Sequence, residues 1–248
     1  MAALSLDTLN RMSSDELTAR LSASPEERMA IVRSAAEAGV VEAQAVRGQM
    51  LLDGADVPKD ARAALRWFES AAKQRHAMAI NMVGRCNEFG GGTPIDKVRA
   101  AGFYKAAADH GLDWGMYNYA TLLTLGEGVA EDKPAALQWL RKAAALGNAK
   151  AINFIGSFCE DGWVVERDIV EAAACYARAA EGGDFRGQFN HARMLIVAGD
   201  IDRALLWLRK IRDNATQIFL EKTESWLRAH DNAEVRERGV AALRGEAA

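Results

Sequence analysis

The sequence predicts an all-α solenoid built from helix-turn-helix repeats. Three observations predict this fold: the chain matches itself at a spacing of 36 residues, each copy carries an aspartate where a helix would begin, and each copy carries a glycine where the preceding helix would end. The stretch from Gly126 to Gly147 shows the pattern most clearly. Asp132 and Pro134 are placed there to start a helix, and Gly147 is placed to end it.

The repeat aligns without gaps over four units. The aspartates expected at helix N-caps are Asp60, Asp96, Asp132 and Asp168. The glycines expected in the turns are Gly54, Gly90, Gly126 and Gly162. Small residues recur in the first helix of each pair, at Gly48, Gly84, Ala120 and Gly156. We expect the gap beside them to be filled from the second helix by Trp67, Phe103, Trp139 and Cys175. One hairpin cannot bury its apolar face alone, so neighbouring units must stack.

The flanks of the array read as caps. Residues 1–40 are expected to form N-terminal capping helices with a partial repeat, after a loose segment at residues 1–5. Residues 213–248 are expected to form C-terminal capping helices with a more polar outer face, as open-ended arrays require. The five repeats between them are predicted at 41–76, 77–112, 113–148, 149–184 and 185–212, together covering 41–212.

Composition excludes several classes of function. The formal net charge of −3 gives no general attraction to nucleic acid or to an anionic membrane. No apolar run reaches the roughly 18 to 20 residues that a membrane-spanning helix needs. The first residues show no basic segment followed by an apolar one, so we expect no secretory signal and a cytoplasmic protein. We therefore expect neither nucleic-acid binding nor membrane insertion, and we expect a monomer.

No catalytic or metal-binding constellation is recognisable. Cys86, Cys159 and Cys175 form no CxxC motif and are interpreted as reduced core thiols. The four histidines share no metal-ligand spacing, and no HExxH or GxSxG motif occurs. The glycine-rich loop 90–92 lacks the lysine and the spacing of a phosphate-binding loop. We expect no enzyme activity, no cofactor and no metal.

The repeat resembles a known family. The pattern of Gly48, Gly54, Asp60, Ala64 and Trp67, with its copies, is similar to Sel1-like repeats, a 36-residue relative of tetratricopeptide repeats. The resemblance covers about residues 24–212. It implies a right-handed α/α superhelix that scaffolds protein–protein interactions, usually without catalysis of its own. Secreted members carry a disulfide in each repeat, and the lack of such cysteine pairs here fits an intracellular member.

Two stretches suggest a narrower resemblance. Residues 111–115 and 183–187, together with 76–79 and 81–86, resemble an uncharacterised proteobacterial subgroup of Sel1-repeat proteins. Members of that subgroup tend to be encoded near TonB-dependent receptors and PKHD-type iron/2-oxoglutarate hydroxylases. The resemblance therefore implies a bacterial protein with a role around iron uptake or an iron enzyme, although no residue of this chain shows iron chemistry.

A stripe of polar side chains is the candidate binding site. In such superhelices the first helix of each pair usually lines the concave face, and spacings of four and seven residues place its side chains on one stripe. The residues expected to bind a partner there are Gln49, Asn81, Arg85, Glu88, Tyr117, Thr121, Asn153, Ser157, Glu160, Phe189 and Arg193. The stripe would hold an extended peptide or the acidic groups of a partner, or it is simply a solvated inner face.

Three further residues are candidate anchors. Trp114 and Arg186 occupy equivalent positions two units apart, and Trp and Arg are frequent at interfaces. Each is followed by a glycine, Gly115 or Gly187, where other units carry alanine. His191 lies near Arg193 and is the most site-like of the histidines. The alternative for Trp114 is that it covers the junction between two units.

Three hypotheses for function follow. The first is a non-catalytic adaptor whose concave groove binds another protein or a peptide. The second is an accessory or regulatory subunit of an iron/2-oxoglutarate-dependent hydroxylase or a TonB-dependent iron uptake system. The third is a small-ligand receptor or enzyme that uses the groove around Tyr117, Arg85, His191 and Arg193.

Overall fold

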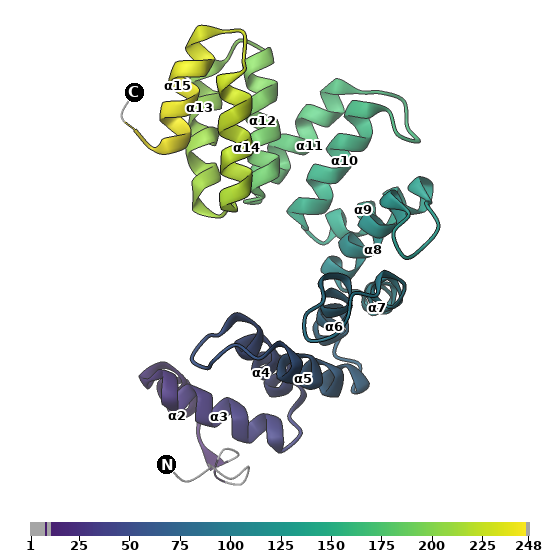
Figure 1. The fold of residues 1–248 in the computed structure, drawn as a ribbon, viewed down its shortest axis with the longest axis vertical. Helices are drawn as coiled ribbons and strands as arrows, with labels where there is room; N and C mark the ends of the chain where they lie inside the picture. The colour runs from purple at the N-terminus through teal and green to yellow at the C-terminus, as the bar shows by residue number, and fades with distance from the viewer. Residues whose placement is uncertain (1–7, 9–10, 247–248) are drawn as a thin grey trace. The chain divides into compact units, whose positions relative to one another are not determined.

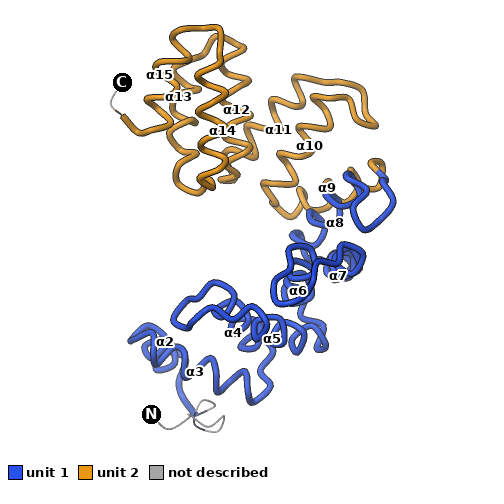
Figure 2. Tube along the Cα trace, viewed as in Figure 1, with its two compact units in different colours: residues 1–132 blue, residues 133–248 orange. Residues whose placement is uncertain are grey.

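The computed structural model describes residue 8 and residues 11–246, and in this part of the chain it contains α-helices, one short 3-10 helix and no strand (Figure 1). The chain divides into two compact units, residues 1–132 and residues 133–248 (Figure 2). The all-α fold of repeating helix pairs is therefore confirmed. The expected loose segment 1–5 lies outside the described residues.

Seven described helices form unit 1, and each packs on the next along the chain. They are α2 (Ser14–Ala23), α3 (Pro25–Glu37), α4 (Val41–Asp53), α5 (Ala61–Lys73), α6 (Ala77–Phe89), α7 (Lys97–Asp109) and α8 (Asp113–Leu125). Serine hydroxyls cap the two N-terminal helices, because those of Ser13 and Ser24 accept from the amides of Glu16 and Glu27.

Unit 2 continues the pattern and then ends it. Its helices are α9 (Lys133–Ala145), α10 (Ala149–Asp161), α11 (Ile169–Glu181), α12 (Phe185–Val197), α13 (Ile201–Lys210), the 3-10 helix η1 (Ile211–Asp213), α14 (Gln217–Arg228) and α15 (Ala233–Arg244). The last two helices pack on each other, and α15 also packs on α13. Their aromatic and aliphatic side chains join one core cluster with those of α12 and α13.

The predicted caps and turns recur with the repeat. Asp60, Asp96 and Asp168 each accept a hydrogen bond from a backbone amide of the first turn that follows, at 2.9 to 3.0 Å. The turn glycines close the first helix of each pair in the left-handed conformation, with φ between 66° and 79°. This conformation costs a residue with a side chain about 1 to 2 kcal/mol, which explains why glycine recurs there.

The gap beside the small residues of the first helices is not filled by the expected side chains. The large buried residue is the next one along each second helix. These residues are Phe68, Tyr104, Leu140 and Tyr176, each at most 1 % exposed. A Cβ at Gly48, Gly84 or Gly156 would lie 2.6 to 2.8 Å from the ring of Phe68, Tyr104 or Tyr176. Trp67, Phe103 and Trp139 are only half-buried at the side of this contact. The prediction was one residue out because both columns carry aromatics and only packing distinguishes them.

Gly115 and Gly187 also have a packing reason. A Cβ at Gly115 would lie 2.7 Å from the Cβ of Ala107, and a Cβ at Gly187 would lie 2.6 Å from the Cβ of Ala179. The first turns of α8 and α12 thus press on the preceding second helix. These departures from alanine are explained by close helix approach.

A second left-handed position lies in each loop between paired helices. It is occupied by Asp56, Gly92, Gly128 and Val164, with φ between 54° and 83°. A Cβ at Gly92 or Gly128 would lie within 2.4 Å of a carbonyl oxygen at the start of an earlier helix, so these loops press on the neighbouring repeat. Asp56 and Val164 are the two residues with a side chain at this position. Aspartate tolerates the left-handed conformation, whereas the β-branched side chain of Val164 is strained in it.

We expect Gly84→Ala to lower the free energy of unfolding by about 1 to 2 kcal/mol, because the added methyl group overpacks the contact with Tyr104. The matched control is Gly102→Ala on α7, where a Cβ would meet nothing within 4 Å. That control should gain about 0.5 to 1 kcal/mol from helix propensity. Urea denaturation of both variants provides the measurement, and equal stability of the two would contradict the packing assignment.

We expect Val164→Gly to raise the free energy of unfolding by about 0.5 to 1 kcal/mol, since it relieves a left-handed β-branched residue. Val164→Ala keeps a Cβ in that conformation and should gain less. Thermal unfolding of the three proteins checks the order. A lower melting temperature for Val164→Gly than for Val164→Ala would argue against strain at this loop.

Candidate functional site

The predicted site residues lie on the first helices of the repeat pairs, which we call the A-helices: α4, α6, α8, α10 and α12. Unit 1 carries Gln49, Asn81, Arg85, Glu88, Trp114, Tyr117 and Thr121. Unit 2 carries Asn153, Ser157, Glu160, Arg186, Phe189, His191 and Arg193.

The asparagines of the stripe bridge neighbouring A-helices. The side-chain amide of Asn118 donates to the side-chain oxygen of Asn81 at 2.9 Å, joining α8 to α6. Asn190 donates to Asn153 at the same distance, joining α12 to α10. Asn81 and Asn153 are buried, at 2 % and 9 % exposure. In this structure their amides therefore hold helices together rather than face a solvent groove.

Glu160 is the centre of a charged cluster in unit 2. The guanidinium of Arg193 binds it through two nitrogens, with N–O distances of 2.7 and 2.6 Å to the two carboxylate oxygens. The hydroxyl of Tyr176 donates to the same carboxylate at 2.7 Å and lies 3.3 Å from the hydroxyl of Ser157. The Arg193 bonds hold the pKa of Glu160 below its usual value. Arg193, which the third hypothesis places in a binding groove, thus already pairs with a carboxylate of its own unit.

Unit 1 contains the same arrangement without its arginine. Tyr104 donates to Glu88 at 2.5 Å, as Tyr176 does to Glu160 two repeats further along the chain. Thr121 occupies the position of Arg193, and its hydroxyl donates to the carbonyl of Tyr117 at 2.9 Å. Arg85, in the position of Ser157, is exposed and has one guanidinium nitrogen 3.9 Å from the sulfur of Met82.

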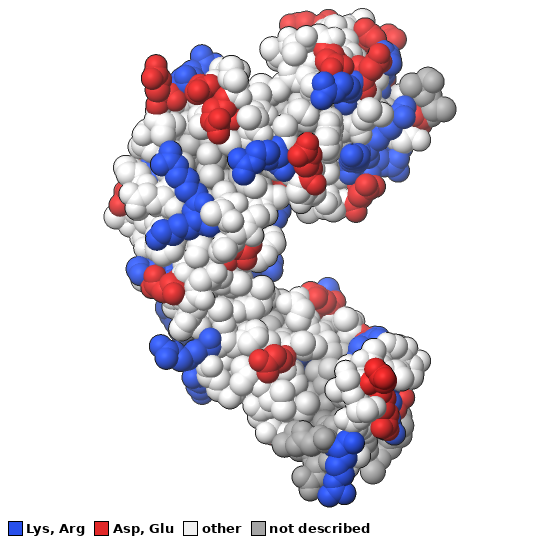
Figure 3. All heavy atoms as spheres, turned by 180° about the vertical axis from the view of Figure 1, so that it is seen from behind, with Lys and Arg blue, Asp and Glu red and all other residues white. Residues whose placement is uncertain are grey.

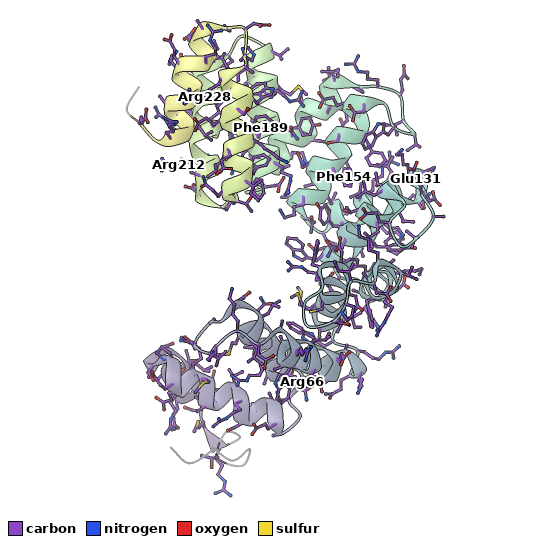
Figure 4. All side chains as sticks on the ribbon, viewed as in Figure 1. Arg66, Glu131, Phe154, Phe189, Arg212 and Arg228 are labelled. Carbon is purple, nitrogen blue, oxygen red and sulfur yellow. The ribbon has the colours of Figure 1, made fainter. Side chains whose placement is uncertain are left out.

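The capping helix α14 packs on the side of α12 that carries Phe185 and Phe189, which we call the A-helix face of α12. Phe189 packs edge-on against Phe219 and Trp226, with ring centroids 5.9 and 5.3 Å away, and lies between α12 and α14 (Figure 4). Phe219 also packs on Phe185 at 4.8 Å. Phe189 is thus part of the cap's core in this structure, because a segment of the same chain already binds it.

The three candidate anchors differ in environment. Trp114 is 40 % exposed and stacks edge-on against Tyr117 at 6.4 Å. The guanidinium of Arg186 lies over the rings of Phe185 and Phe219, at 4.7 and 5.9 Å. The ring of His191 packs against Trp207 at 5.4 Å. Its buried Nδ1 has no hydrogen-bond partner among the described residues, and burial lowers the pKa of the imidazole.

The remaining predicted residue, Gln49, is exposed on α4 and donates to Asp53 one turn later at 2.6 Å. Charged groups on the protein surface are mixed: acidic and basic side chains lie close together on the face drawn in Figure 3. That face presents no broad field of one sign, which is what binding to a polyanion would use.

Each unit also has a surface groove between its second helices. In unit 1 a groove of about 500 Å³ is lined mainly by apolar groups around Ile80 and Phe103. In unit 2 the groove around Ile152 and Cys175 lies at the equivalent positions two repeats later and is about 330 Å³. The sequence did not predict either groove, because apolar residues at these positions look like core.

The cysteines behave as buried thiols. Cys86, Cys159 and Cys175 are free and buried, which confirms the prediction of core thiols rather than disulfides. Burial raises the pKa of Cys175 to about 12, so its thiol stays protonated and poorly nucleophilic. In the part of the chain that the structure describes, no group of three His, Cys, Asp or Glu side chains is placed to hold a metal ion.

A period of two repeats is the signal that sequence reasoning overlooked. The two tyrosine–glutamate bonds come from Tyr104 and Tyr176, and the two asparagine bridges come from Asn118 and Asn190. None of these four residues was in the predicted stripe. They match between units two apart and not between adjacent ones. Alignment at the spacing of a single repeat averages alternate repeats together and hides this pairing.

Comparison with known proteins identifies the repeat. The sequence model of the family described as Sel1 repeat matches residues 41–76, 77–112, 115–148, 149–184 and 191–214. These segments make up more than half of the chain. The chain belongs to the Sel1 repeat family. Proteins of this family are generally protein-interaction scaffolds, typically without catalysis.

Solved Sel1-repeat structures share the solenoid fold. A Sel1 repeat protein from Oxalobacter formigenes is 26 % identical with a TM-score of 0.68, and the match covers 92 % of this chain and 98 % of that one. A protective antigen present in uropathogenic Escherichia coli strains is also 26 % identical, with a TM-score of 0.67 and coverage of 89 % and 48 %.

A curated relative matches over a shorter region. DAP3-binding cell death enhancer 1 of Rattus norvegicus is 31 % identical over 163 residues, which covers 50 % of this chain and 32 % of that protein. The match thus spans about a third of the rat protein's length.

Among the described residues of the present chain, no helix combines the length and the apolar character required to cross a bilayer.

We expect Glu160→Gln to lower the free energy of unfolding at neutral pH by about 1 to 2 kcal/mol, because it breaks a charged hydrogen-bonded cluster. Since folding lowers the pKa of Glu160, its contribution is complete above the ordinary value of about 4.3 and is lost as pH falls through the lower folded value.

Urea midpoints measured from neutral pH down to strongly acidic pH give the test. The parent should lose stability below about pH 4.3 more steeply than Glu160→Gln. The exposed carboxylate of Glu166 provides the control variant, Glu166→Gln, whose profile should follow the parent. Parallel profiles for parent and Glu160→Gln would show that the cluster is not formed in solution.

Proposed function

We propose that the protein is a non-catalytic adaptor that binds another protein through the A-helix face of unit 1. This face is the side of α6 and α8 that carries Met78, Arg85, Glu88, Trp114 and Thr121. One observation carries the proposal: the equivalent face in unit 2 already holds a protein segment, α14, through Phe185 and Phe189. An A-helix face of this chain can therefore accommodate a helix, and membership of the Sel1 repeat family supports the same role.

The A-helix face of unit 1 has exposed apolar groups of the kind that protein interfaces use. Met78 and Trp114, one repeat apart on α6 and α8, are each 40 % exposed. Arg85, Glu88 and Thr121 follow them along the same two helices. An aromatic anchor with polar groups around it is the usual composition of an interaction hot spot.

The association with an iron-dependent hydroxylase or with iron uptake remains a prediction of the narrower sequence resemblance. Co-purification with such an enzyme, or a change in its activity when this chain is added, would test it. A small-ligand receptor is less well supported, because Arg193 is paired with Glu160 within unit 2.

We expect the double variant Met78→Ala and Trp114→Ala to reduce partner capture at least about tenfold, because truncation of interface anchors typically costs about 2 kcal/mol or more. Helicity and melting temperature should stay close to the parent, since both side chains lie at the surface, each 40 % exposed. The measurement is affinity purification from the native cell with quantitative mass spectrometry.

The matched control is Val98→Ala, which removes an apolar side chain that is 69 % exposed on α7 in the same unit. Proteins whose recovery falls with the double variant but not with Val98→Ala are the partners. If the double variant and the control recover the same proteins in the same amounts, the A-helix face of unit 1 is not the binding surface.

A further inference from the structure

In the Glu160 cluster, a glutamate that is paired with a tyrosine binds an arginine side chain. Both carboxylate oxygens accept from the guanidinium of Arg193, and one of them also accepts from the hydroxyl of Tyr176. The guanidinium carbon lies 6.0 Å from the centre of the tyrosine ring. The carboxylate thus binds a guanidinium through two parallel bonds, while the tyrosine fixes the carboxylate's position.

Glu88 and Tyr104 reproduce this acceptor in unit 1. Tyr104 donates to one oxygen of Glu88, and it is the only hydrogen-bond partner of that carboxylate within the described part of the chain. Tyr104 is only 1 % exposed, so its hydroxyl holds the carboxylate from a fixed side. The acceptor positions that Arg193 uses on Glu160 are therefore open on Glu88.

The side chain that would fill these positions is replaced by a short one. Thr121 stands in the same place relative to Glu88, on the next A-helix, as Arg193 does relative to Glu160. Its hydroxyl donates to the backbone of Tyr117 within its own helix and does not bind Glu88. Threonine is shorter than arginine, and Glu88 is only half-buried, so its carboxylate keeps access to solvent.

We propose that Glu88, Tyr104 and Thr121 form a seat for an arginine side chain of the partner protein. The proposal rests on the proposed function of the A-helix face of unit 1, and it specifies one chemical feature of the partner. Arginine fits better than lysine, because the two open acceptor positions suit a planar guanidinium and an ammonium cannot satisfy both in the same way.

Arg85 is the charged neighbour that an incoming arginine would meet. It lies one turn before Glu88 on α6, but its guanidinium contacts the sulfur of Met82 and makes no ion pair with Glu88 in the described structure. Its positive charge weakens the attraction of the seat for a cation. We therefore expect Arg85→Ala to tighten the binding of arginine.

The test titrates the full-length chain with N-acetylarginine methylamide and follows the methyl signal of Thr121 by NMR. The parent should show a saturable shift. N-acetyllysine methylamide should bind at least about tenfold more weakly, because it lacks the paired donors. Glu88→Gln should weaken arginine binding by at least about tenfold, because it removes the charge of the acceptor.

Two reciprocal variants sharpen the test. Thr121→Arg should abolish arginine binding and raise the melting temperature, because its own guanidinium fills the seat; calorimetric titration follows this variant, which lacks the threonine methyl group. Arg193→Thr should open a second seat beside Glu160, which the methyl signal of the new threonine reports. Glu42→Gln removes an exposed carboxylate on α4 in the same unit and is the matched control. It should bind arginine as the parent does, and its contrast with Glu88→Gln keeps the test decidable if Thr121→Arg does not fold.

The proposal is overturned if no saturable shift appears, if Glu88→Gln binds arginine as well as the parent, or if lysine binds equally well. The titration uses no partner protein, so these failures leave the adaptor role itself untouched. Conversely, partner capture that depends on Trp114 but is unaffected by Glu88→Gln would reject the arginine seat alone.

Discussion

The contact between a glycine and a buried aromatic ring is the constraint on which the paired helices depend. In three of the described pairs, the first helix carries a glycine whose missing Cβ makes room for Phe68, Tyr104 or Tyr176. The ring comes so close that a Cβ on the glycine would clash with it, so the contact restrains how the two helices pack. That packing also brings the hydroxyls of Tyr104 and Tyr176 to Glu88 and Glu160, so the packing contact and the polar clusters arise from the same residues.

The fold could be predicted almost completely from the sequence, because caps and turns are local. Asp60 and Gly54 need only their own neighbours to act as a cap and a turn, and the regular spacing of the repeat copies them along the chain. The filling of the gap was predicted one residue away from its true position, since Trp67 and Phe68 are both aromatic. A sequence does not show which of two adjacent rings faces the partner helix until the helix pair is packed.

The contacts made by the candidate site residues could not be read from the sequence, because polar residues on one stripe can bond to each other. Asn81 and Arg193 were expected to face a partner, yet in this structure they bind Asn118 and Glu160. Phe189 was expected in a groove and lies under α14, which the repeat pattern does not describe. Trp114 is 40 % exposed, as an anchor can be, and its binding role stays a prediction.

The alternation between successive repeats has a consequence for how such a chain can change length. The bonds from Asn118 to Asn81 and from Asn190 to Asn153 each join unlike repeats, and these asparagines recur only in every second repeat. Duplication of a single repeat would place like beside like and leave a buried asparagine without its partner. Duplication of two repeats together would preserve these asparagine bonds, so the natural building block for lengthening this array is a pair.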